Sequence, residues 1–190
     1  MVLLHGRGAT AEDILTLVRE VNQPDFAYLA PQAAGYSWYP ERFLEPIERN
    51  EPWLTSALAL VSGIVMRIQE TGIPAERTIL LGFSQGACLA LEWAARNARR
   101  YGGVVGLSGG LIGPDGTPRN YPGSLHGTPV FTGCSDVDPH IPKERVADSA
   151  EILRELGGDV TLRLYPGMGH TINQDEVNFV RELMRNLVDS

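Results

Sequence analysis

The chain has 190 residues, 43% of them hydrophobic, and its 23 acidic and 16 basic side chains give a formal net charge of −7. This length suits one domain that buries roughly 70% of its unfolded surface. The chain is acidic overall and has no basic stripe that could follow a phosphate backbone, so nucleic acid is not an expected partner. No stretch approaches the roughly 20 apolar residues that span a bilayer, and stable membrane insertion is not expected either.

Short apolar runs alternate along the chain with longer segments of helical periodicity. The runs predict strands at residues 1–4, 26–30, 78–83, 103–109, 128–133 and 160–166. The intervening segments predict helices after the capping box of Thr10 and Asp13, over residues 53–70, from Gln85, and over residues 143–156 and 175–188. This alternation favours an α/β fold with a mostly parallel central sheet flanked by helices.

Two stretches break the alternation, at residues 31–53 and 109–129. Both are rich in Pro and Gly and contain several aromatic side chains. Loops of this length in a compact domain are usually functional.

The two cysteines, Cys88 and Cys134, are too few for a disulfide framework and do not have metal-ligand spacing. We therefore expect two free thiols in a reducing compartment, the cytoplasm.

A serine stands between two glycines where the third apolar run meets a helical segment. Gly82-Phe83-Ser84-Gln85-Gly86 fits G-x-S-x-G, the tight strand-to-helix turn that exposes a nucleophilic serine. The pattern alone is weak in a chain with 21 glycines. The preceding strand and following helix supply the structural context that the motif requires, so Ser84 is the predicted nucleophile.

A serine needs a base and an acid, and both are predicted downstream. His170 follows the last expected strand, which favours it as the general base, whereas His126 and His140 lie within loops without such placement. Asp136 and Asp138 both follow the strand at residues 128–133, and spacing alone leaves either as the acid.

An oxyanion formed on Ser84 would need backbone donors. The N–H of Gln85, next to the nucleophile, is one candidate. The N–H of Arg7, in the glycine-containing loop after the first expected strand, is the other. His5 is predicted to order that loop rather than to act in catalysis.

Six ordered motifs resemble the phospholipase/carboxylesterase family of α/β-hydrolases, which includes bacterial carboxylesterases and acyl-protein thioesterases. They are "LHGRGAT", "PQAAGYSWYP", "GIPAERTILLGFSQGACLAL", "GLSGGL", "GCSDVDPHIP" and "YPGMGH". The resemblance implies a compact α/β-hydrolase without a large cap domain, which hydrolyses esters or thioesters without cofactor or metal. The family pattern of an aspartate followed by Pro, a variable residue, an aliphatic residue and Pro matches "DPHIP" and so selects Asp138.

The chain departs from the family pattern at three places. Strand material before the "LHG" loop is absent, so we expect residues 1–190 to be a single α/β-hydrolase domain without N-terminal strands. Two extra residues lie between Gly133 and the acid. The segment "WYPERFLEP" resembles bacterial esterases more than thioesterases that act on lipidated proteins.

The sequence thus predicts a serine carboxylesterase for short- to medium-chain esters of small molecules. An apolar acyl pocket beside Ser84 is hypothesised from the two long loops, with the side chains Trp38, Tyr39, Phe43, Leu44, Leu111 and Ile112, and with Met168 near the leaving group. Alternatively, these side chains only seal the loops onto the domain, or pack in a homodimer.

Three other functions are weighed against it. The first is a lysophospholipase or acyl-protein thioesterase. The second is an acyltransferase or a dienelactone hydrolase, although the latter uses a cysteine nucleophile, against which Ser84 argues. The third is a catalytically silent binding protein on the same scaffold.

Overall fold

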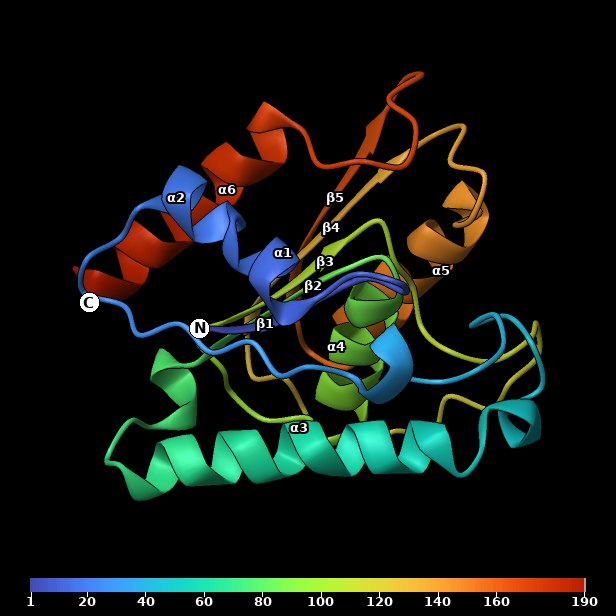
Figure 1. Cartoon of the computed structure of the whole chain (residues 1–190), viewed down its shortest axis with the longest axis horizontal. Helices are drawn as coiled ribbons and strands as arrows, with labels where there is room; N and C mark the ends of the chain where they lie inside the picture. The colour runs from blue at the N-terminus through green and yellow to red at the C-terminus, as the bar shows by residue number, and fades with distance from the viewer. Residues whose placement is uncertain (190) are drawn as a thin grey trace.

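The computed structural model describes residues 1–189 and contains one five-stranded sheet in the order β1-β2-β3-β4-β5 (Figure 1). All neighbouring strands are parallel. Their bounds are Val2–Leu4 (β1), Ile79–Phe83 (β2), Gly103–Leu107 (β3), Pro129–Ser135 (β4) and Asp159–Tyr165 (β5). The parallel α/β architecture predicted from the alternation is confirmed.

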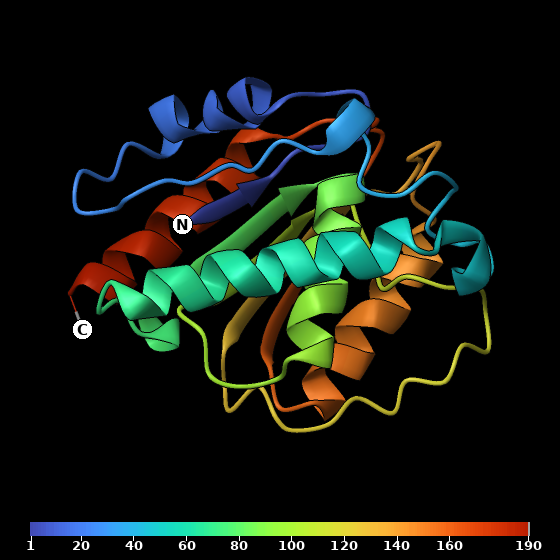
Figure 2. The same ribbon diagram turned by 60° about the horizontal axis from the view of Figure 1, so that its bottom comes forward.

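Helices cover both faces of this sheet (Figures 1 and 2). They are Ala11–Leu15 (α1), Leu17–Val21 (α2), Trp53–Glu70 (α3), Gln85–Arg96 (α4), Lys143–Glu155 (α5) and Gln174–Val188 (α6), with short 3-10 turns at Ala34–Tyr36 (η1), Ile47–Asn50 (η2) and Ala75–Arg77 (η3). Apolar side chains of α1, α2 and α6 form one core cluster with the sheet, and those of α3, α4 and α5 form the other. Strand residues alternate between the two clusters, Leu80 facing one and Leu81 the other.

The predicted first helix is present but divided. Thr10 and Asp13 form the expected capping box at its start. The Thr16 hydroxyl donates to the carbonyl of Asp13 at 2.6 Å, and the helix ends there before α2 begins. A hydroxyl that bonds a nearby carbonyl competes with the helical backbone pattern, which explains the break.

The strand predicted at residues 26–30 is wrong. Only Leu29 pairs with the sheet, through one isolated bridge to Val2. Its N–H donates to the carbonyl of Met1 at 2.9 Å, and its carbonyl accepts from Leu3 at 2.8 Å. Because β1 has only three residues and Pro31 follows closely, no longer ladder forms, although the apolar pattern of the run is that of a strand.

Helix α4 is the most buried of the helices, and its first turn lies directly against β1 and β2. All residues from Gln85 to Ala95 are buried. A Cβ added to Gly86 would lie 2.1 Å from the carbonyl oxygen of Leu4, and one added to Gly82 would lie 2.1 Å from that of Gly86. Only glycine permits this approach of strand and helix backbones.

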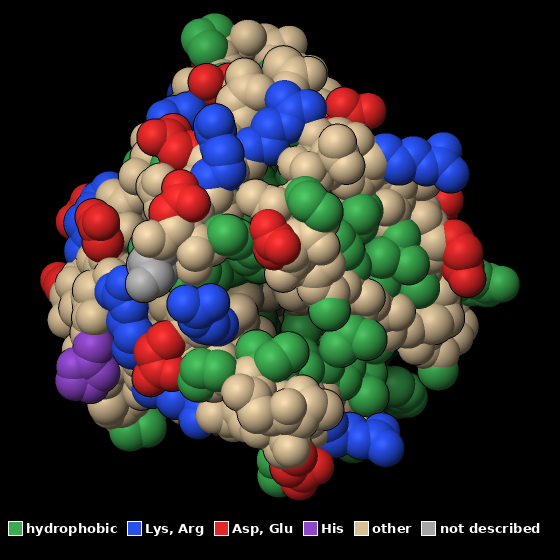
Figure 3. All heavy atoms as spheres, turned by 90° about the vertical axis from the view of Figure 1, so that its left-hand side faces the viewer, with side chains coloured by type: hydrophobic (Ala, Val, Ile, Leu, Met, Phe, Trp, Pro, Cys, Tyr) green, Lys and Arg blue, Asp and Glu red, His purple; other side chains and the backbone are tan. Residues whose placement is uncertain are grey.

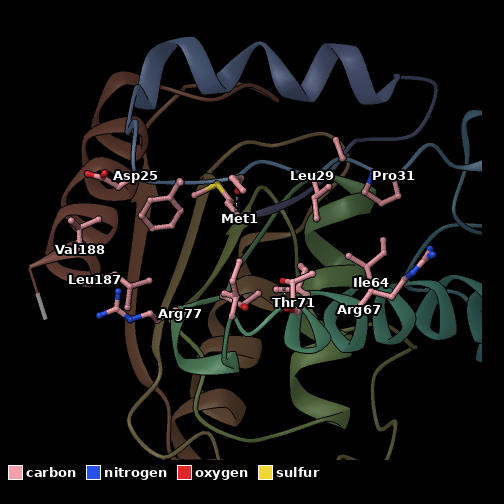
Figure 4. A pocket seen from close by; sticks show the side chains of 16 residues that line it. Met1, Asp25, Leu29, Pro31, Ile64, Arg67, Thr71, Arg77, Leu187 and Val188 are labelled. Carbon is pink, nitrogen blue, oxygen red and sulfur yellow. Dashed lines mark hydrogen bonds between the residues drawn. The ribbon is translucent and has the colours of Figure 1, made fainter.

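A large apolar groove lies at the end of the sheet opposite to the first turn of α4, on the face of the molecule that Figure 3 shows. It has a volume of about 860 Å³ and is bordered by segment 25–31 and by the ends of α3 and α6 (Figure 4). Met1 and Thr78, which precede β1 and β2, line it. The groove therefore faces the amino ends of the strands, whereas loops that carry functional groups gather at the carboxyl ends.

Both cysteines are buried free thiols. Burial raises the pKa of Cys88 and of Cys134 to about 12. Thiols are reactive as thiolates, so neither is a nucleophile near neutral pH.

Glu176 is a buried carboxyl in the first turn of α6. Its Oε2 accepts from the N–H of Asn173 at 2.9 Å, whereas Oε1 has no hydrogen-bond partner within the described residues. Burial raises the pKa of Glu176 from 4.5 to about 7, opposed by the Asn173 hydrogen bond and increased slightly by Asp175. Much of the folded protein consequently holds this carboxyl protonated at neutral pH.

Glu176→Gln should change how stability depends on pH. Because the pKa in the folded state lies above that of the unfolded chain, the stabilising contribution is fully present below about pH 4.5 and is lost as the pH rises through 7. Glutamine keeps the cap and remains neutral at every pH. The free energy of unfolding of the variant, relative to that of wild type, should therefore increase between pH 5 and pH 8 by up to roughly 3 kcal/mol. Urea unfolding at the two pH values measures this difference, and a difference independent of pH would contradict it.

Gly86→Ala should destabilise the protein by about 3 kcal/mol or more, because the added methyl overlaps a backbone carbonyl that cannot move away. Gly63→Ala in α3 is the matched control. A Cβ at Gly63 meets nothing within 4 Å, so this helical substitution should stabilise by about 0.5–1 kcal/mol. Chemical denaturation measures the free energy of unfolding of both variants. Equal changes would show that the close approach of Gly86 to the Leu4 carbonyl does not exclude a methyl group.

Candidate active site

Three loops at the carboxyl edge of the sheet bring the predicted catalytic side chains together. Ser84 follows β2, Asp138 follows β4 and His170 follows β5. His170 Nε2 lies 2.8 Å from Ser84 Oγ, and His170 Nδ1 lies 2.7 Å from Asp138 Oδ2. These are hydrogen-bond distances, so the three groups form a continuous relay across residues that are far apart in sequence.

Ser84 occupies the sharp turn between β2 and α4. Its backbone has φ 54° and ψ −119°, a sparsely populated conformation for a residue with a side chain. Its N–H donates to Leu107 of the neighbouring strand at 2.9 Å, and its carbonyl accepts from Cys88 at 3.0 Å. The backbone is therefore anchored on both sides, and the hydroxyl stands at the N-terminus of α4.

The loop that carries His170 is held by the end of β4. Asp136 Oδ1 accepts from the N–H of Gly167 at 2.8 Å, and Ser135 Oγ accepts from the N–H of Gly169 at 3.1 Å. Asp136, which spacing left open as the acid, thus contacts the histidine loop and not the imidazole. Asn173 ends the loop with a capping box on α6.

Asp138 has a fully buried side chain that is nevertheless ionised. Burial alone would raise the pKa of Asp138, but the hydrogen bond from His170 and two backbone N–H groups lower it below its usual value. Those N–H groups belong to His140 and Ile141 and lie 2.8 and 3.0 Å from Oδ1. A carboxylate held this way fixes the tautomer and orientation of the imidazole.

His5 and Gln85 organise the loops around the nucleophile. The buried ring of His5 accepts from the N–H of Ala33 at 3.1 Å, and the His5 carbonyl accepts from Trp38 Nε1 at 2.8 Å. The Gln85 amide accepts from the Trp38 N–H at 3.0 Å and donates to the Tyr39 carbonyl at 2.7 Å. The loop-ordering placement of His5 was expected, whereas the bonds of the Gln85 side chain had no sequence signal.

A cleft of about 260 Å³ opens beside Ser84 and His170. Two of the side chains predicted to form an acyl pocket, Tyr39 and Phe43, line this cleft. Four residues that the sequence did not single out for substrate contact also line it, and these are Arg42, Cys88, His140 and Ile141. His140 stands within the motif "GCSDVDPHIP" and Arg42 within the segment "WYPERFLEP", but nothing in their spacing indicates that their side chains face Ser84.

The structure does not bring the remaining predicted pocket residues to this cleft. Trp38 is buried, and Leu44 packs partly buried against the core. Met168 is partly buried, and its sulfur accepts from the Asn173 amide. Leu111 and Ile112 are fully buried in the core below α4 and α5.

Buried polar bonds explain why the second long loop turns inward. The N–H of Ile112 donates to the Glu92 carboxylate at 3.0 Å, and the carbonyl of Leu111 accepts from Arg145 at 3.0 Å. Glu92 lies on α4 and is also paired with Arg96 and Arg119. Such hydrogen-bonded ion pairs fix the loop to the helices, so its apolar side chains fill the core instead of the cleft.

Within residues 1–189, no group of three or more His, Cys, Asp or Glu side chains has a geometry that could hold a metal ion. None of the described helices has the length and apolarity required to cross a bilayer.

Comparisons with known proteins agree with this fold. The crystal structure of a phospholipase/carboxylesterase from Dyadobacter fermentans superposes with a TM-score of 0.93 and 47% identity, covering 97% of this chain and 88% of that one. Acyl-protein thioesterase 1 of Neurospora crassa is 23% identical over 209 residues, covering 97% of this chain and 84% of the relative. Acyl-protein thioesterase 1 of Gibberella zeae is 35% identical over 125 residues, which is 61% of this chain and only half of the relative's length.

The family model described as phospholipase/carboxylesterase matches residues 1–188, nearly the whole chain. Together with the five-stranded parallel sheet, this match shows that the chain belongs to the phospholipase/carboxylesterase family of α/β-hydrolases.

Proposed function

We propose that the protein is a serine carboxylesterase that cleaves short- to medium-chain carboxylic esters through an acyl-enzyme on Ser84. The observation that carries this proposal is the relay of two hydrogen bonds, 2.8 Å from Ser84 to His170 and 2.7 Å from His170 to Asp138. A serine hydroxyl becomes an effective nucleophile when a positioned base accepts its proton in the transition state.

In the proposed first half-reaction, Ser84 Oγ attacks the ester carbonyl while His170 Nε2 takes the hydroxyl proton. The resulting imidazolium is stabilised by the Asp138 carboxylate, which remains ionised throughout. Collapse of the tetrahedral intermediate breaks the bond to the alcohol, and Nε2 returns its proton to the departing oxygen. Water then repeats the sequence on the acyl-enzyme and releases the carboxylic acid.

The oxyanion of each tetrahedral intermediate is assigned to the backbone N–H groups of Arg7 and Gln85. Within the described residues, neither N–H donates a backbone hydrogen bond. The N–H of Gln85 also belongs to the first turn of α4, where the helix dipole favours negative charge. Two such donors stabilise charge that develops only in the transition state.

Hydrolysis of thioesters or lysophospholipids is a second candidate activity. It is favoured by the similarity to the Gibberella zeae and Neurospora crassa relatives, which are both named acyl-protein thioesterase 1. The cleft beside Ser84 measures about 260 Å³, which suits a short acyl group better than a long one. We therefore place small esters first, in a protein whose unpaired thiols favour a cytoplasmic location.

Ser84→Ala should abolish labelling by a fluorophosphonate probe and lower hydrolysis of p-nitrophenyl butyrate by about four orders of magnitude or more. Loss of the nucleophile removes the acyl-enzyme, while the fold stays intact. The exposed Ser56 in α3 supplies the control, and Ser56→Ala should leave both readouts unchanged. Labelling that persists in Ser84→Ala would refute the assigned nucleophile and return the silent binding protein to first place.

Phe43→Ala should move the preferred acyl chain toward greater length, because Phe43 walls the cleft and its removal leaves space for further methylenes. The ratio of kcat/KM for p-nitrophenyl octanoate to that for acetate should rise about tenfold. Leu44→Ala is the comparison, since Leu44 packs against the core beside it. A ratio that changes equally in both variants would indicate that Phe43 does not define the acyl site.

A further inference from the structure

The cleft beside Ser84 has a charge opposite to that of the protein as a whole. The chain carries a formal charge of −7. The basic side chains that line the cleft are nonetheless two arginines, Arg7 and Arg42, and two histidines, His140 and His170, and the lining includes no carboxylate. The side chain of Asp138, the acid of the relay, is fully buried and does not line the cleft.

The Arg7 guanidinium is held in place by main-chain groups. Its two terminal nitrogens donate to the carbonyl oxygens of Pro40 and Glu41. A guanidinium has five N–H donors, so three remain unused. Arg7 forms no ion pair within the described residues, so its charge is not neutralised. A fork that is already oriented loses little conformational entropy when it binds an anion.

Arg42 contributes a second unneutralised guanidinium to the same cleft. The Arg42 side chain donates one long hydrogen bond of 3.4 Å to the carbonyl of His140, and it forms no ion pair with a carboxylate in the part of the chain that the structure describes. His140 in turn packs edge-on against the His170 ring, with centroids 4.8 Å apart. One residue, His140, therefore contacts both the Arg42 guanidinium and the ring of His170.

We propose that Arg7 and Arg42 form a binding site for a negatively charged group of the substrate, so that the enzyme prefers esters bearing a carboxylate near the scissile bond. This inference rests on the proposed ester hydrolysis and specifies its substrate class. Planar guanidinium forks match the geometry of a carboxylate, and charge-assisted hydrogen bonds are stronger than neutral ones. The anionic group lies on the acyl side or on the alcohol side of the ester, and the experiment separates these two arrangements.

The test compares kcat/KM for matched anionic and neutral esters at fixed ionic strength. Monomethyl adipate against methyl hexanoate places the carboxylate on the acyl side, and meta-acetoxybenzoate against its methyl ester places it on the alcohol side. Wild type should prefer the anionic member of one pair by about tenfold or more. Added salt should reduce that preference, because the arginines are exposed and their field is screened.

Arg42→Gln should lower the anionic-to-neutral ratio about tenfold, and Arg42→Lys should retain part of it because the charge remains while the fork is lost. Arg67→Gln is the matched control. Arg67 lines the apolar groove at the far end of the sheet and should leave both ratios unchanged. Fluorophosphonate labelling of Ser84 in each variant verifies that the nucleophile is still assembled.

The outcomes separate this inference from the proposed function. Turnover of the neutral esters without any anionic preference, or with a preference that Arg42→Gln does not reduce, overturns the anion site and leaves the esterase assignment standing. Absence of turnover on every ester together with absence of Ser84 labelling overturns both.

Discussion

The close approach of helix α4 to strands β1 and β2 is the constraint on which the site depends. Gly82 and Gly86 leave no space for a Cβ, so the chain reverses within one residue and Ser84 takes a positive φ. The strain of that conformation is offset by the burial of nearly all of α4 between the sheet and α3. A well-packed helix thereby presents one hydroxyl in a fixed direction.

The remaining groups of the relay depend on a second set of contacts at the same edge of the sheet. The end of β4 supplies Ser135 and Asp136, which hold the backbone of the histidine loop, and then Asp138, which holds the histidine ring. One short segment thus positions both the loop and its imidazole. Loops that carry function need such supports, because they lack the regular hydrogen bonds of strands and helices.

The distribution of charge gives the cleft a character that the average composition does not suggest. The electrostatic potential at a surface depends on the local arrangement of charges as well as on the net charge. Within the cleft, two guanidinium groups without carboxylate partners make the largest contribution to that potential. The same loop that carries Arg42 also supplies the carbonyls that fix Arg7. The segment between Trp38 and Phe43 therefore carries one of these guanidinium groups and fixes the other.

The sequence alone determined the parallel α/β architecture and most helix bounds to within one residue, because hydrophobic periodicity and turn chemistry are local properties. Ser84 and His170 were identifiable because strand ends in a parallel sheet converge on one edge. Spacing left Asp136 and Asp138 both open as the acid, and the resemblance to the family pattern selected Asp138. Only the tertiary structure decided which loop side chains face the cleft. Leu111 and Ile112 read like pocket residues, yet Glu92 and Arg145 draw their loop into the core through pairings between distant segments. Side-chain direction in a long loop depends on such non-local contacts, which no periodic pattern encodes.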